Sequence, residues 1–150
     1  MSMAHIHEKV DFTVEVFIVC EGKVLLRKHD KYGIWLSVGG HIELDEDPNQ
    51  AALREVKEEV GLDIKLFDTR EYFGDEKIKE LIAPVSMNRH RISDSHEHVT
   101  LMYFARSTTS VVVPEKPTDE WKWCSKEDIA AMSDLVSDIR FYANMALDTL

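Results

Sequence analysis

Cysteine, long apolar runs and positive charge are all scarce in this chain. Cys20 and Cys124 are too few for a disulfide framework, so each is expected to be a small buried residue rather than a nucleophile. No apolar run approaches the ~20 residues of a membrane span. The first twelve residues lack the basic-then-apolar layout of a signal peptide. We therefore expect a cytoplasmic protein with no membrane partner.

The shortage of positive charge excludes a further class of partner. The chain has 18 Lys and Arg against 28 Asp and Glu, for a formal net charge of −10. Polymeric nucleic acid requires a basic footprint, so it is not expected to bind here. A small phosphorylated substrate stays compatible with this charge, because bound cations can supply the neutralising charge.

The length of 150 residues, without repeats or long linkers, indicates one domain spanning residues 1–150. Strands are predicted over residues 10–20, 23–29, 35–38, 62–72, 98–106 and 120–124, and a Gly-Gly turn follows the third. Helices are predicted over residues 48–60, from Ser125 onward and over 137–147. The strand at 98–106 is apolar on both faces, which implies a layer above and below the sheet. The fold class is therefore α/β, with a mixed sheet covered by helices on both sides.

The ends of the first helix can be read from its capping residues. Asp47 suits the N-cap, Pro48 suits the first helical position, and Gln50 completes a capping-box pattern. Gly61 suits the left-handed residue that ends a helix. The helix is thus predicted to run from Pro48 to Val60.

Three carboxylates share one face of this helix. Glu55, Glu58 and Glu59 stand at i, i+3 and i+4, where like charges repel by a few tenths of a kcal/mol each. They lie beside an apolar stripe formed by Ala52, Leu53, Val56 and Val60. A solvated acidic face is the ordinary interpretation of such a charge run. The alternative is a site for a hard divalent cation, which takes oxygen ligands.

The surroundings of the three glutamates favour the cation site. Residues 40–62, GHIELDEDPNQAALREVKEEVGL, resemble the signature of the Nudix hydrolases, Gly-x5-Glu-x7-Arg-Glu-U-x-Glu-Glu-x-Gly-U, where U is aliphatic. Every defined position is filled, by Gly40, Glu46, Arg54, Glu55, Val56, Glu58, Glu59, Gly61 and Leu62. A chance match at one starting point is on the order of one in a billion. The resemblance implies the Nudix-type α/β/α sandwich.

The same resemblance implies roles for individual residues. Glu58 and Glu59 are expected to be ligands of Mg²⁺ or Mn²⁺, with the carbonyl oxygen of Gly39 as a further ligand. Glu55 is expected to be either a ligand or the general base, so the catalytic set is Glu55, Glu58 and Arg54. Arg54 is expected to pair with Glu46 or to orient the carboxylates. Gly40, Glu46 and Gly61 are structural members of the signature.

Outside the signature the resemblance implies fewer residues. Arg27 matches a position where relatives often place a cation on the substrate phosphate. Relatives often add a carboxylate from a distant loop, as an extra metal ligand or as the base. Glu97 is the first candidate, counted with Arg27 among the substrate-binding residues, and Asp94 and Glu120 stand behind it. Two positions depart from the family pattern, because Ser37 and Val38 stand where relatives usually have an aliphatic residue and a proline.

His96 and His98 lie on one face of a strand, where they could suggest a transition-metal site. Without a cysteine or a third histidine at metal spacing, a polar strand entrance is the better interpretation, and substrate contact is the alternative.

The expected activity is metal-dependent hydrolysis of a pyrophosphate bond in a nucleoside diphosphate linked to another group. A non-catalytic Nudix-fold binding or regulatory module is the alternative, although such proteins usually lose signature carboxylates. The substrate stays open among nucleoside triphosphates, nucleotide sugars and non-nucleotide pyrophosphates. A homodimer is compatible with the resemblance, because related enzymes are often dimers.

Overall fold

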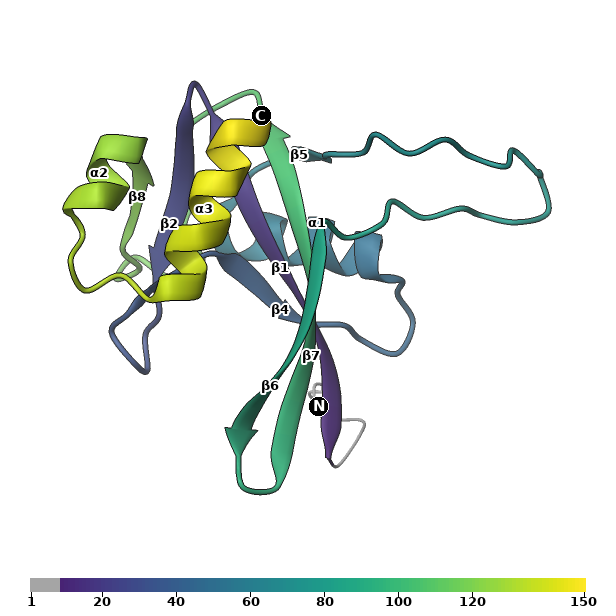
Figure 1. The fold of residues 1–150 in the computed structure, drawn as a ribbon, viewed down its shortest axis with the longest axis horizontal. Coiled ribbons are helices and arrows are strands. Elements are labelled where there is room, and N and C mark those ends of the chain that lie inside the picture. The colour runs from purple at the N-terminus through teal and green to yellow at the C-terminus, as the bar shows by residue number, and fades with distance from the viewer. Residues whose placement is uncertain (1–8) are drawn as a thin grey trace.

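The computed structural model describes residues 9–150 and shows a mixed eight-stranded sheet with helices on both faces (Figure 1). Its strands are β1 (Val10–Cys20), β2 (Lys23–Lys28), β3 (Trp35–Leu36), β4 (Val38–His41), β5 (Ile64–Leu66), β6 (Ser86–Ser93), β7 (His96–Ser107) and β8 (Trp121–Cys124). Its helices are α1 (Pro48–Val60), α2 (Lys126–Ala131) and α3 (Ser137–Thr149). The predicted α/β sandwich with a mixed sheet is confirmed.

Strand β1 is the centre of the sheet. It pairs with β7 in parallel along ten residues and with β2 and β4 antiparallel on its other edge. The alternation of side chains across a strand then divides the molecule into two cores. Val14, Val16 and Ile18 pack on the face covered by α1, whereas Phe17 and Val19 pack on the face covered by α3.

The capping residues of α1 behave as predicted. The Asp47 carboxylate accepts a hydrogen bond from the backbone N–H of Gln50, and the Gln50 side chain accepts one from the N–H of Asp47. Gly61 ends the helix in the left-handed region at φ 68°. One detail of the predicted apolar stripe is wrong, because Leu53 is 44% exposed and Ala51 is fully buried in its place.

Two predicted strand boundaries are also wrong. Gly39 and Gly40 do not form a turn; they belong to β4 and pair with Glu15 and Val14 of β1. The strand predicted over residues 62–72 is confined to Ile64–Leu66, the residues of β5 that pair with the end of β7. Residues 67–85 form a long loop that extends away from the sheet (Figure 1).

Strand β6 has no counterpart among the predicted elements. It pairs antiparallel with β7 and forms a hairpin with it, although most of its residues are exposed. Cys20 and Cys124 are both buried free thiols, as expected. None of the helices in residues 9–150 combines the length and the apolar composition that a membrane crossing requires.

Candidate active site

Arg54 donates hydrogen bonds to several of the acidic side chains on and near α1. Its Nε and Nη2 donate to the two carboxylate oxygens of Glu46 at 2.9 and 2.6 Å, a bidentate pair. Nη2 also donates to the backbone oxygen of His41 at 2.9 Å, which ties the helix to β4. Nη1 donates to Glu55 at 3.0 Å and to Glu58 at 3.2 Å. The expected pairing of Arg54 with Glu46 and its contact with the carboxylates are therefore both present in the structure.

The two glycines of β4 let the strand approach the helix closely. A Cβ on Gly40 would lie 2.3 to 2.7 Å from the carboxylate atoms of Glu55. A Cβ on Gly39 would lie 2.1 Å from the backbone oxygen of Val14. The Gly39 N–H also points to Glu59, whose carboxylate it reaches at the long distance of 3.4 Å. Neither glycine has a positive φ, so backbone conformation does not require glycine here. The close contacts require it instead, because they leave no room for a Cβ atom.

The carboxylates of Glu55 and Glu59 are held away from water. Burial raises the pKa of Glu55 above its ordinary value, although Arg54 opposes the shift. Burial raises the pKa of Glu59 to about 8, with Arg27 opposing and the neighbouring Glu55 contributing. Glu58 differs from both, because its side chain is 54% exposed.

A cavity of about 550 Å³ opens beside Glu59, whereas Glu55 and Glu58 are not among the residues that line it. This volume lies in the range typical of small-molecule sites. Glu59, Gly39 and Arg27 line one part of it, and the start of α3 contributes Asp138 and Ile139. The cavity therefore joins the acidic face of α1 to the α3 face of the sheet.

Arg27 lies in this cavity, as its predicted role requires. Its guanidinium lies 3.6 Å from Glu59 and 3.7 Å from the buried Asp119. Both distances are longer than the N–O distance of a hydrogen-bonded ion pair, so Arg27 makes no tight ion pair with either carboxylate. A cation at this position faces the space next to the glutamates.

The three carboxylates considered outside the signature do not line the cavity. Glu97 accepts two hydrogen bonds from Arg89 across the β6–β7 hairpin, at 2.9 and 3.0 Å. Asp94 lies fully exposed at the end of that hairpin, and Glu120 pairs with Lys28 at the surface. Arg89, the partner of Glu97, is one of several hairpin residues that do line the cavity.

Sequence reasoning missed a buried acid in the cavity wall. Glu15 on β1 accepts a hydrogen bond from the Ser37 hydroxyl at 2.5 Å. Burial raises the pKa of Glu15, and Asp138 across the cavity adds to the shift. The signal for this residue was a lone glutamate within the apolar run VEVFIV. Ser37, which departs from the family pattern, is its partner.

The histidines of β7 belong to a larger polar group than the sequence indicated. His96 and His98 lie beside His41 of β4 and His90 of β6, with ring centroids 5.0 to 5.8 Å from that of His98. Burial lowers the pKa of His98 to about 4, with His41 the next cause. The sequence near His96 and His98 offers no third histidine at metal spacing, but His41 of β4 lies beside them in the structure.

Comparison with known proteins now identifies the family. The family model of the NUDIX domain matches residues 11–145, which include β1, the whole acidic helix and nearly all of α3. The chain belongs to the Nudix family. The resemblance drawn from residues 40–62 is therefore confirmed, and with it the expectation of a Nudix hydrolase.

The relatives of this Nudix chain include two proteins with named substrates. It is 32% identical over 99 residues to the CTP pyrophosphohydrolase of Escherichia coli K12, covering 60% of this chain and 72% of that protein. It is 41% identical over 61 residues to the dihydroneopterin triphosphate diphosphatase of Haemophilus influenzae, covering 41% of this chain and 39% of that protein.

Solved structures agree with the fold. A Nudix-family hydrolase from Clostridium perfringens superposes with a TM-score of 0.83 at 37% identity, covering 93% of this chain and 97% of that one. A MutT Nudix hydrolase from Burkholderia pseudomallei shares the fold, with a TM-score of 0.64 at 22% identity, covering 95% and 99% of the two chains.

Proposed function

We propose that the protein is a divalent-cation-dependent pyrophosphohydrolase that cleaves a phosphoanhydride bond of a nucleoside triphosphate or a closely related heterocyclic triphosphate. The observation that carries the proposal is the arrangement around Arg54, which gathers Glu46, Glu55 and Glu58 beside the glycines of β4. A non-catalytic module has no need of three carboxylates held at such close range.

The residues at this site fit a hard divalent cation. Glu55 and Glu59 are both largely buried, and burial without a cation raises the pKa of Glu59 to about 8, which favours its protonated form. Mg²⁺ or Mn²⁺ would take the place of that proton and reverse the repulsion among the carboxylates. Glu55, Glu58, Glu59 and the carbonyl oxygen of Gly39 would hold the ion. When bound, such an ion lowers the pKa of coordinated water and neutralises phosphate charge.

The protein's own residues would handle the rest of the reaction. Arg27 would attract the substrate phosphates, because it is the cation that lines the cavity next to Glu59. Arg54 would fix the carboxylates without touching the substrate, since its donors already contact Glu46, Glu55, Glu58 and the His41 carbonyl. Glu55 would serve either as a ligand or as the base that accepts a proton from the attacking water.

The triphosphate class is supported by the names of the two relatives. One is named for CTP and the other for dihydroneopterin triphosphate, so both act on a triphosphate attached to a heterocycle-bearing group. The cavity of about 550 Å³ has room for such a molecule. Glu15 and Ser37, which line this cavity, would offer polar groups to the heterocycle.

A substrate panel tests the proposal. The purified protein is incubated with CTP, the other nucleoside triphosphates, dihydroneopterin triphosphate and nucleotide sugars, with Mg²⁺, Mn²⁺ or EDTA. Products are identified by chromatography and phosphorus NMR. We expect a monophosphate and pyrophosphate from at least one triphosphate, and no product in EDTA. Tight binding of a nucleotide without turnover under any metal condition would instead support the non-catalytic alternative.

A further inference from the structure

A polar stripe crosses one face of the sheet on three adjacent strands, β4, β1 and β7. On β1 the alternate residues Asp11 and Thr13 share this face, and the β1–β7 register places His98 opposite Asp11. His41 of β4 lies opposite Thr13. The stripe continues the α3 face of β1, beyond the point where the apolar residues of that face end. Three strands thus bring a carboxylate and two imidazoles to one place.

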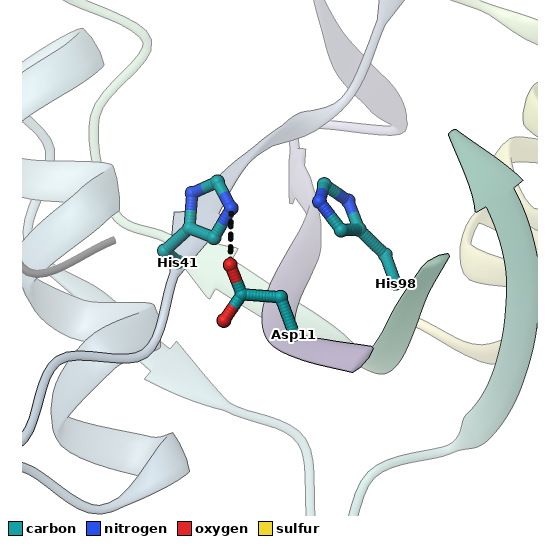
Figure 2. A group of neighbouring side chains, drawn as sticks. All are labelled: Asp11, His41 and His98. Atoms are coloured by element: carbon teal, nitrogen blue, oxygen red, sulfur yellow. Dashed lines mark ion pairs between the residues drawn. The ribbon is translucent and has the colours of Figure 1, made fainter. Parts of the chain in front are cut away.

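The three side chains turn toward one another (Figure 2). The His41 Nε2 lies 3.3 Å from the Asp11 Oδ2, and one donor atom from each of Asp11, His41 and His98 lies within 4.8 Å of the others. In a tetrahedral zinc site with bonds of about 2.0–2.1 Å, neighbouring donors are about 3.3–3.4 Å apart. One pair already has this spacing, and the wider separations need to close by at most about 1.5 Å.

Burial makes a bound cation favourable at this position. Asp11 is 2% exposed, and a buried carboxylate requires a compensating positive charge. Three histidine rings lie close by, because the ring centroids of His41 and His96 lie 5.1 and 5.0 Å from that of His98. Protonating all three rings would place like charges in contact. Within residues 9–150, the buried Nε2 of His98 has no hydrogen-bond partner. A lone pair on this atom is available to a metal ion.

We propose that Asp11, His41 and His98 form a second metal site, specific for a divalent transition metal such as Zn²⁺ and separate from the glutamates of α1. Two imidazole nitrogens and one carboxylate oxygen match the ligand set of zinc sites that keep an open position. His96, whose Nε2 lies 3.9 Å from the Asp11 Oδ2, orients the carboxylate from outside the ligand set. Mg²⁺ is a poor occupant, because it prefers oxygen ligands.

The open position of this site faces the cavity, because His41 and His98 both line it. His41 directly follows Gly40, and its backbone oxygen accepts the hydrogen bond from Arg54. The transition-metal site therefore shares β4 with the expected Mg²⁺ site, through His41 and Gly39, but uses different ligand chemistry. A ligand that enters the cavity can present a nitrogen or oxygen atom to it.

Cobalt titration tests the proposal without depending on catalysis. The full chain is freed of metal with EDTA, transferred to a buffer with excess Mg²⁺, and titrated with Co²⁺ while its visible d–d absorption is followed. We expect one equivalent of Co²⁺ to bind with a four-coordinate spectrum, and one equivalent of Zn²⁺ to displace it. Loss of the signal when Mg²⁺ is in excess would overturn the proposal.

Single substitutions identify the ligands. Asp11→Asn, His41→Asn and His98→Asn are each expected to weaken Zn²⁺ binding by at least ~100-fold, because even outer-shell partners of metal ligands are worth 10–100-fold. His98→Asn is the most informative, since the lost nitrogen has no hydrogen-bond partner within residues 9–150. Wild-type affinity in His41→Asn and His98→Asn would refute the assignment.

Two controls separate this site from other metal binding. The double variant His5→Asn/His7→Asn removes histidines that precede the described residues and is expected to bind Co²⁺ like wild type. Glu58→Gln disturbs the expected Mg²⁺ site and should also keep its Co²⁺ spectrum. Unfolding midpoints in EDTA show that each variant folds. Zn²⁺ should raise the midpoint of the wild type but not that of His98→Asn, and equal rises would contradict the proposal.

Discussion

Replacing Gly40 by alanine is expected to remove activity while leaving stability nearly unchanged. The new Cβ would lie 2.3 Å from the nearest oxygen of Glu55, whereas ordinary contact begins at 3.4 Å. The carboxylate must therefore retreat by about 1.1 Å, the difference of these two distances. The displaced atoms are the end of a side chain and not backbone, so the movement costs less than about 1 kcal/mol of folding free energy.

The same displacement is large for catalysis. A misplacement of about 1 Å in a catalytic group can reduce the rate by ~100-fold. We therefore expect the kcat/KM of Gly40→Ala to fall by about two orders of magnitude in the Mg²⁺-dependent hydrolysis assay. Its urea unfolding curve should overlap that of the wild type to within about 1 kcal/mol.

Gly39→Ala is the matched control for this prediction. Its Cβ would lie 2.1 Å from the Val14 oxygen and 3.1 Å from the Cα of Glu15, both of which are backbone atoms of β1. The β1–β4 pairing must then open, which costs about 1–3 kcal/mol or more. The two substitutions should thus have different effects: Gly40→Ala should reduce activity, and Gly39→Ala should reduce stability. Wild-type kcat/KM in Gly40→Ala would refute the proposed position of Glu55.

Three further predictions concern α1 and its N-cap. Arg54→Lys should lower stability by about 1–3 kcal/mol and also lower kcat, because lysine cannot make the bidentate pair with Glu46; urea unfolding and initial rates check this. The raised pKa of Glu59 means that the folded chain binds this proton more tightly than the unfolded chain. Stability of the metal-free protein should therefore fall as pH rises from about 4.5 toward 8, and Mg²⁺ should raise the thermal midpoint more at pH 8.5 than at pH 6, where it competes with the proton. An equal rise at both values would contradict the raised pKa of Glu59. Asp47→Ala should cost about 1 kcal/mol of unfolding free energy through the lost capping box and leave kcat within twofold of wild type.

The acidic helix was predictable because local chemistry determines it. Asp47 and Gly61 mark its ends, and these caps depend only on residues within a few positions along the chain. Strand β1 was likewise readable from its apolar, β-branched run. The pairing of Arg54 with Glu46 followed from the family signature, which carries spacing information that a single helix does not.

The parts that could not be predicted depend on contacts between distant strands. Gly39 and Gly40 resemble a turn in sequence, and only the pairing of β4 with β1 makes them strand residues. Strand β6 is polar and exposed, so it has no hydrophobic periodicity, and its pairing with β7 alone identifies it. Glu15 and Asp11 were visible as charges within an apolar strand, but their partners come from elsewhere in the chain.

The metal question shows the same limit. His96 and His98 alone were too few for a site, and His41 lies more than 50 residues away in sequence. The parallel register of β1 and β7 brings Asp11 opposite His98, and the β4 register adds His41. The proposed transition-metal site therefore depends on the pairing of three strands and not on any local motif.

The most direct test of the proposed function is the Mg²⁺-dependent release of pyrophosphate from CTP by the wild type and by Glu59→Gln. Glutamine resembles the protonated form of this side chain, so the variant should fold normally while lacking a cation ligand. We expect pyrophosphate from the wild type in Mg²⁺, none in EDTA, and at least ~100-fold slower release by Glu59→Gln. Equal rates for the two proteins, or undiminished release in EDTA, would contradict the assignment of the acidic helix as the catalytic metal site.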